Sequence, residues 1–144
     1  MRKLLVAVVA LLATVSFASP AAAAANPHTY RELCGSGYNL VTNGVIDLKT
    51  TAGALYGQMY VTWNGSAQMN CVVVIKRSFV GTRSETGVSI TRPNSEGGWD
   101  AGNFEYYAGP LYEDAAGQCI TVTGWVWNTA HTAQAKKTQT GWCS

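Results

Sequence analysis

A run of five apolar residues in the middle of the chain limits what it can fold into. Residues 71–75 include four consecutive β-branched side chains, and the polar residues Asn70 and Lys76 bound the run. β-branched side chains favour a pleated strand, and a strand without polar alternation is usually buried on both faces. The run is too short to span a bilayer and lacks the period of an amphipathic helix. It predicts the central strand of a sheet.

Further strand patterns surround this segment and are separated by turn signals. The clearest alternation is in residues 54–63, where Leu55, Met59, Val61 and Trp63 share the face expected to point into the core. Asn43-Gly44 predicts a bulge or break in the first strand. We therefore predict an all-β fold, a small antiparallel sandwich or barrel of six to seven strands. Besides the central run, the expected strands are residues 38–48, 54–63, 85–91, 102–108, 118–127 and 133–140.

The beginning of the chain has the layout of a secretory signal peptide. Arg2 and Lys3 precede an apolar run at residues 4–17, and small residues follow it up to position 25. The apolar run is shorter than the roughly 20 residues that a membrane-spanning helix needs. We expect cleavage of residues 1–25 and a single secreted β domain over residues 26–144, with no membrane attachment after cleavage.

Loss of this segment makes the chain electrically balanced. Without Arg2 and Lys3, eight basic and eight acidic side chains remain. Nucleic-acid binding usually needs a net basic surface, so no nucleic-acid partner is expected. The pairs Lys76-Arg77 and Lys136-Lys137 are expected to be solvated, the second on an edge strand.

Four cysteines lie in the expected domain: Cys34, Cys71, Cys119 and Cys143. An even number in an exported chain predicts two disulfides, and the cysteines lack the close spacing of zinc ligands. If seven strands run up and down, Cys34 and Cys71 lie at one end and Cys119 and Cys143 at the other. This order favours the pairs Cys34–Cys71 and Cys119–Cys143. The nested pairing, Cys34–Cys143 with Cys71–Cys119, remains open.

No catalytic, cofactor or metal site is expected. Glycoside hydrolysis needs two carboxylates within about 5–10 Å, and most acidic residues here are in expected loops. His28 and His131, which a serine triad would need, are near the cleaved end and in a turn.

The aromatic residues give a better-supported hypothesis, because exposed rings can stack on ligands. Tyr56 and Tyr60 are expected on one face opposite the core, and Trp125 and Trp127 on one face of another strand. These four are the candidate ligand-stacking residues. The alternative is that they fill the core or pack under loops, which is the commoner position of tryptophan.

Four motifs and a cysteine next to the C-terminus resemble the spore-associated protein A family of actinomycetes. The motifs are LCGSGY at 33–38, NCVVVIK at 70–76, FEYYAGP at 104–110 and AAGQC at 115–119. The resemblance covers essentially the whole mature chain. It implies a small exported protein found with the spores of filamentous actinomycetes, and it brings no catalytic activity or ligand site. Trp125, Trp127 and Trp142 are additional tryptophans in this chain.

Three functions are weighed on these grounds. The first is a non-catalytic secreted protein that associates with the spore surface or cell-wall components. The second is a carbohydrate- or wall-binding module that uses exposed tyrosine and tryptophan. The third, a protease inhibitor, is less well supported, because the loop at residues 92–96 has no adjacent cysteine to make it rigid.

Overall fold

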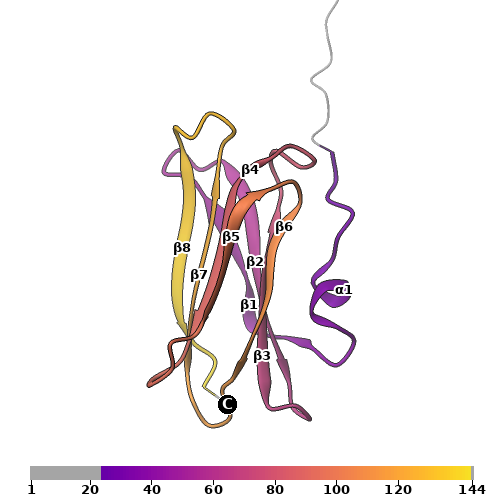
Figure 1. Ribbon diagram of the computed structural model, residues 1–144, viewed down its shortest axis with the longest axis vertical. Coiled ribbons are helices and arrows are strands. Elements are labelled where there is room, and N and C mark those ends of the chain that lie inside the picture. Colours follow the sequence, from indigo (N-terminus) through magenta and orange to yellow (C-terminus); the bar gives the residue numbers. More distant parts are fainter. Residues whose placement is uncertain (1–23, 144) are drawn as a thin grey trace, which may run out of the picture.

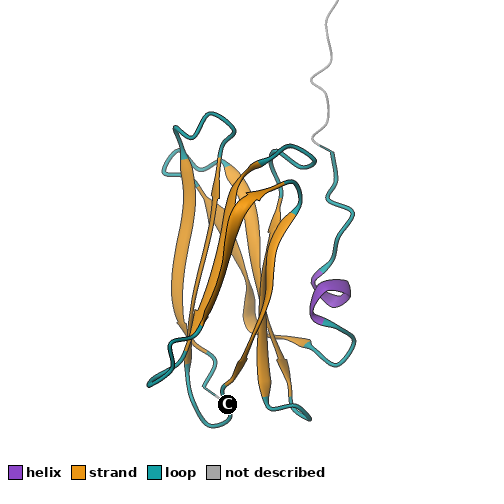
Figure 2. Cartoon of the chain, viewed as in Figure 1, coloured by secondary structure: helices purple, strands orange, loops and turns teal. Residues whose placement is uncertain are grey.

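The computed structural model describes residues 24–143 and shows two antiparallel sheets packed face to face (Figures 1 and 2). The first sheet has the strand order β1-β2-β3-β6 and the second sheet β5-β4-β7-β8. The fold is thus an all-β sandwich, as predicted. The elements are α1 (Tyr30–Cys34), β1 (Asn39–Lys49), β2 (Leu55–Asn64), β3 (Met69–Lys76), β4 (Ser84–Thr91), β5 (Gly98–Phe104), β6 (Tyr107–Asp114), β7 (Ile120–Trp127) and β8 (Gln134–Gly141).

The predicted signal peptide falls almost wholly on residues 1–23, which lie outside the described residues. Its cleavage and the domain boundary at residue 26 therefore stay predictions. Within residues 24–143, no helix has the length and apolar character that crossing a membrane requires.

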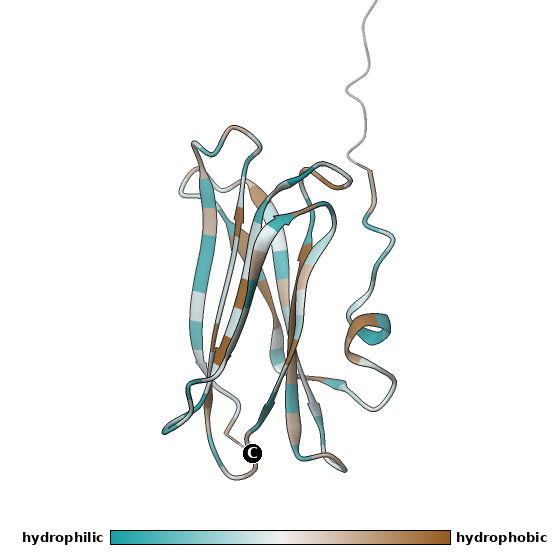
Figure 3. Cartoon of the chain, in the orientation of Figure 1, coloured by the Kyte–Doolittle hydropathy of each residue, from teal (hydrophilic) through white to brown (hydrophobic). Residues whose placement is uncertain are grey.

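Strand β3 is buried on both faces, as its apolar run predicts. Val72 and Val74 pack in the core between the two sheets, and Val73 and Ile75 pack on the opposite face beneath the N-terminal segment. Lys76 was expected to be solvated, but it is fully buried at the end of β3. Figure 3 shows the contrast between the apolar inner strands and β8, which is drawn largely in the hydrophilic colour.

The sandwich has eight strands because the predicted strand at residues 102–108 is divided by a turn between β5 and β6, which belong to different sheets. Aromatic residues lie on both sides of this turn at residues 105–106, so the turn has no clear sequence signal. Pro110 lies within β6. It is tolerated because β6 is the edge of the first sheet, and the register against β3 shifts between Val72 and Val74.

The predicted irregularity in the first strand is present as a bulge. The register of β1 against β2 shifts between Leu40 and Val45, and Asn43 has a positive φ of 57°. Gly44 is required at this bulge, because a Cβ atom there would lie 2.5 Å from the carbonyl oxygen of Val61.

The two disulfides join Cys34 to Cys71 and Cys119 to Cys143, which is the favoured pairing. Their expected location at opposite ends is wrong. The additional strand reverses the direction of β7 and β8, so β1, β3 and β7 all start at the end where β8 finishes. Both bridges therefore lie at the same end of the sandwich, the lower end in Figure 1.

The N-terminal segment covers part of the outer face of the first sheet, over β3 and β6. Helix α1 has Thr29 as its N-cap, whose side chain accepts a hydrogen bond from the Glu32 N–H. The helix contacts β3 and β6 and lies beside the first sheet in Figure 1. Tyr30 stacks on Tyr60 of β2 with ring centroids 5.3 Å apart. The two sheets thus differ, because α1 packs on the first sheet only.

Candidate functional site

The structure separates the two candidate tyrosines, so the prediction that they share one exposed face is wrong. Tyr60 is only 8% exposed and lies in the apolar cluster under the N-terminal segment. Its hydroxyl donates to Gln58 and accepts a hydrogen bond from the Arg77 guanidinium. A ring held in this way is not available for a ligand.

Tyr56 lies on the other face because β2 contains a second bulge. The register pairs Leu48 with Gly57 but Lys49 with Leu55, which leaves Tyr56 as the additional residue. Its side chain packs against the core between the sheets and meets the ring of Phe79 edge-on, with centroids 4.9 Å apart. This bulge inverts the expected orientation of Tyr56.

Trp125 and Trp127 do share a face, as predicted, and it is the outer face of the second sheet. Strand β7 alternates regularly, with Ile120, Val122 and Val126 in the core. The two tryptophans therefore point away from the core, together with Thr121 and Thr123.

The indole of Trp125 lies flat over the neighbouring strand β4. A Cβ atom on Gly87, its register partner, would be 2.1 Å from indole Cζ2, so only glycine leaves room for the ring. The indole Nε1 donates a hydrogen bond to Oε1 of Glu85, at 3.2 Å. The glycine and the carboxylate together fix the orientation of the ring.

Glu85 also connects Trp125 to the second tryptophan through a histidine. Its Oε2 is 2.7 Å from Nε2 of His131, and the His131 ring stacks on Trp127 with centroids 4.1 Å apart and an interplanar angle of 10°. The hydrogen bond from His131, reinforced by that from Trp125, holds the pKa of Glu85 below its ordinary value. The carboxylate therefore stays ionised at neutral pH and holds the Trp125 and His131 rings in place.

Trp99 is a third member of this surface, and the sequence analysis missed it. It lies on β5 opposite Ser89 and is 74% exposed. The alternating positions Trp99, Ala101 and Asn103 could have indicated one outward face of a strand. The sequence analysis instead began its strand at residue 102, so it did not place Trp99 on a strand. We call the outer surface around Trp99, Trp125 and Trp127 the tryptophan face.

Two pairs of threonine hydroxyls share the tryptophan face with the three indoles. Thr121 pairs with Thr140, and Thr123 pairs with Thr138, through hydroxyl–hydroxyl hydrogen bonds of 2.8 and 2.9 Å. Only β4 separates β5, which carries Trp99, from β7, which carries Trp125. The backbones of these two strands are therefore about 10 Å apart. Flat rings beside hydroxyl groups can stack on apolar ring faces and hydrogen-bond to the edges.

Among the outward positions of β4, β5, β7 and β8, Glu85 is the single carboxylate. In residues 24–143, no group of three or more His, Cys, Asp or Glu side chains is arranged to hold a metal ion.

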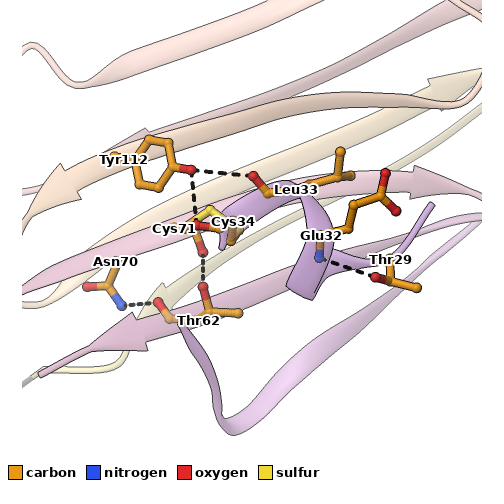
Figure 4. The surroundings of a disulfide bond; sticks show 8 residues. All are labelled: Thr29, Glu32, Leu33, Cys34, Thr62, Asn70, Cys71 and Tyr112. Atoms are coloured by element: carbon orange, nitrogen blue, oxygen red, sulfur yellow. Dashed lines mark hydrogen bonds between the residues drawn. A yellow bond between two sulfur atoms is a disulfide. The ribbon is translucent and has the colours of Figure 1, made fainter. Parts of the chain in front are cut away.

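The Cys34–Cys71 disulfide fastens the segment that covers the opposite face of the molecule (Figure 4). The hydroxyl of Tyr112 donates to the carbonyl oxygens of Leu33 and Cys34, at 3.4 and 3.1 Å. The hydroxyl of Thr62 donates to the Cys71 carbonyl at 3.0 Å. The disulfide and the Tyr112 hydrogen bonds have a structural role, since they hold α1 against β3 and β6.

The fold and the tryptophan face define a small, disulfide-braced β-sandwich protein in which the N-terminal segment covers part of the first sheet and leaves the second sheet uncovered. The chain is 33% identical over 121 residues to spore-associated protein A of Streptomyces coelicolor, an alignment that covers 82% of this chain and 71% of that relative. It therefore belongs to the spore-associated protein A family, which confirms the resemblance in the motifs. No protein-family model matches the chain. No solved structure matches it either.

Proposed function

We propose that this protein is a non-catalytic exported protein that attaches to the spore or cell surface of an actinomycete by its tryptophan face. The observation that carries the proposal is the uncovered outer surface of the second sheet, where Trp99 is 74% exposed. An apolar ring of this size exposed on the same sheet face as two further indoles is typical of an interaction surface.

Two further features support an exported, surface-bound role. The relative in Streptomyces coelicolor is named for its association with spores. The two disulfides suit an oxidising environment outside the cytoplasm.

Fractionation of spores, mycelial walls and culture fluid tests the surface association. We expect the protein in the spore or wall fraction after a high-salt wash, because stacking of indoles is less sensitive to salt than ion pairing. A Trp99→Ala variant should move into the fluid, while Val45→Ala, which changes an exposed apolar residue of the first sheet, should not. Wild-type protein found only in the fluid would contradict the proposal.

A second candidate function is binding of wall carbohydrate, and the arrangement of the tryptophan face favours it. Sugar rings have apolar C–H faces that stack on indoles, and the threonine hydroxyls beside the rings can bond to sugar hydroxyls. The equal numbers of acidic and basic side chains expected in the mature chain favour a neutral polymer over a strongly charged one.

Retention on insoluble peptidoglycan, chitin and cellulose distinguishes the two candidates. For a carbohydrate-binding module, Trp99→Ala and Trp125→Ala should each weaken retention roughly tenfold, the equivalent of about 1.4 kcal/mol. Retention by none of the three polymers would leave the surface role without carbohydrate recognition. Release of soluble sugar during the incubation would contradict the non-catalytic role.

A further inference from the structure

Trp127 differs from the other two indoles of the tryptophan face because another side chain covers it. The His131 ring lies nearly parallel to the indole, with centroids 4.1 Å apart and an interplanar angle of 10°. An imidazole stacked in this way occupies one face of the indole, so that face is closed to a ligand. Trp99, by contrast, is 74% exposed. The covered ring can therefore join the tryptophan face only if His131 moves.

The loop between β7 and β8 presents His131 from a backbone that is itself well bonded. Asn128 Oδ1 accepts hydrogen bonds from the N–H groups of Thr132 and Ala133, at 2.8 and 3.2 Å. The Asn128 carbonyl accepts another from the His131 N–H, at 3.1 Å. The side chain of His131 is 57% exposed, so it has room to turn into solvent. Rotation of this side chain alone would uncover Trp127, with the loop backbone left in place.

The Glu85 carboxylate on β4 holds the imidazole over the indole. Its Oε2 lies 2.7 Å from His131 Nε2. When His131 is protonated, this contact is an ion pair, and the imidazolium also lies on the face of an indole, which attracts cations. When His131 is neutral, a single hydrogen bond and the ring stacking remain. The closed position is therefore more stable when the imidazole carries a charge.

The other charged groups near this pair are few. On the outward side of the second sheet, β8 adds Lys136 and β5 adds the neutral Asn103. Arg83, just before β4, forms an ion pair with Glu105 at 3.3 Å. Histidine is the residue type whose charge ordinarily changes between pH 5 and 8, so a pH change in this range acts on the cover of Trp127.

We propose that His131 is a pH-sensitive lid on Trp127. The lid is closed while the imidazole is protonated and opens more often once the imidazole is neutral. The tryptophan face then offers Trp99 and Trp125 at mildly acid pH and gains Trp127 at mildly alkaline pH. The consequence for attachment rests on the proposed function, whereas the lid is a property of the free protein.

Hydroxyl-radical oxidation of the purified exported protein, mapped by mass spectrometry, measures how accessible each indole is. Trp99, which lies on the same sheet face, is the internal reference at every pH. The oxidation of Trp127 relative to Trp99 should rise about threefold from pH 5 to pH 8, because loss of an exposed ion pair changes a local equilibrium a few-fold. An equal ratio at both pH values would overturn the proposal.

Two variants test whether the histidine and the carboxylate form the lid. His131→Asn removes the ring, and asparagine tolerates the positive φ of 56° at this position. It should give the high oxidation ratio at both pH values. Glu85→Gln keeps an acceptor for the Trp125 indole but loses the charge, so its ratio should already be high at acid pH. An unchanged pH dependence in His131→Asn would overturn the proposal.

Retention on insoluble peptidoglycan, chitin and cellulose at the same two pH values separates the lid from the proposed function. A polymer that retains the protein should hold the wild type more strongly at the higher pH and His131→Asn equally at both. Equal retention of the wild type would overturn the coupling of the lid to attachment. If neither a polymer nor the spore and wall fractions retain the protein, the proposed function fails, and the oxidation ratios still decide on the lid.

Discussion

Lys76 is the largest fully buried side chain of the described protein. Its ammonium group donates to the carbonyls of Thr82 and Phe104, at 2.7 and 3.0 Å, and to the Ser84 hydroxyl at 2.9 Å. These acceptors are uncharged, and burial lowers the pKa of Lys76 to about 8. The side chain reaches from the end of the first sheet to β4 and β5, so it links the two sheets through hydrogen bonds.

The buried lysine predicts a characteristic pH dependence of stability. The unfolded lysine has an ordinary pKa of 10.5, so between pH 8 and 10.5 the unfolded chain binds more protons than the folded one. The free energy of unfolding should therefore gain about 3 kcal/mol from this group as the pH rises through that window. Urea unfolding of wild type and Lys76→Met at several pH values measures it. The free energy of unfolding of the wild type, relative to that of Lys76→Met, should increase with pH across this window. A constant difference between the two proteins would refute this explanation.

At the scale of single residues, the sequence predicted which side chains are buried where the chain follows a regular pleat. The outward orientation of Trp125 and Trp127 followed from alternation along β7. The predicted orientation of Tyr56 was wrong because Tyr56 is the additional residue of a bulge beside Leu48. Such a bulge is set by cross-strand hydrogen bonds, which a single strand pattern does not reveal. The burial of Lys76 depends on acceptors from β4 and β5, which no local pattern reveals.

At the scale of elements, the Cys34–Cys71 bridge controls whether α1 stays on the first sheet. The double variant Cys34→Ala/Cys71→Ala should lose roughly 3–4 kcal/mol of stability, and proteases should cut near residues 30–37 while the sandwich is still folded. The matched variant Cys119→Ala/Cys143→Ala should lose a similar amount without becoming sensitive at that segment. Cleavage sites measured by mass spectrometry check this prediction, and identical cleavage in both variants would contradict it.

The sequence predicted an element correctly where the residues of that strand alone indicated its structure. The apolar run of β3 and the Asn43-Gly44 bulge of β1 needed no information from other strands. The turn between β5 and β6 was missed because aromatic residues continue through it, and the outward position of Trp99 was missed with it. A hollow lined by Val41, Trp63 and Trp142 was also beyond prediction, because it forms between the first sheet and residues that follow β8.

At the scale of the whole molecule, both disulfides brace the same end of the sandwich. The opposite end, with the loops at residues 50–54 and 128–133, has only non-covalent contacts. Local opening should therefore begin there. Hydrogen exchange should be faster for the β7–β8 pairs near Trp127 and Gln134 than for those near Thr121 and Thr140. Reduction of the disulfides should diminish this difference, and a uniform exchange rate in the oxidised protein would contradict the prediction.

The covered first sheet has a consequence for how the protein would sit on its target. Asn26, near the start of the described chain, donates to the carbonyls of Lys76 and Tyr106 at 3.1 and 2.8 Å and so lies beside the first sheet. A molecule attached by its second sheet would turn this part of the chain toward the medium. Adsorbed molecules would then share one polarity, with their amino termini accessible to an antibody or a fused reporter.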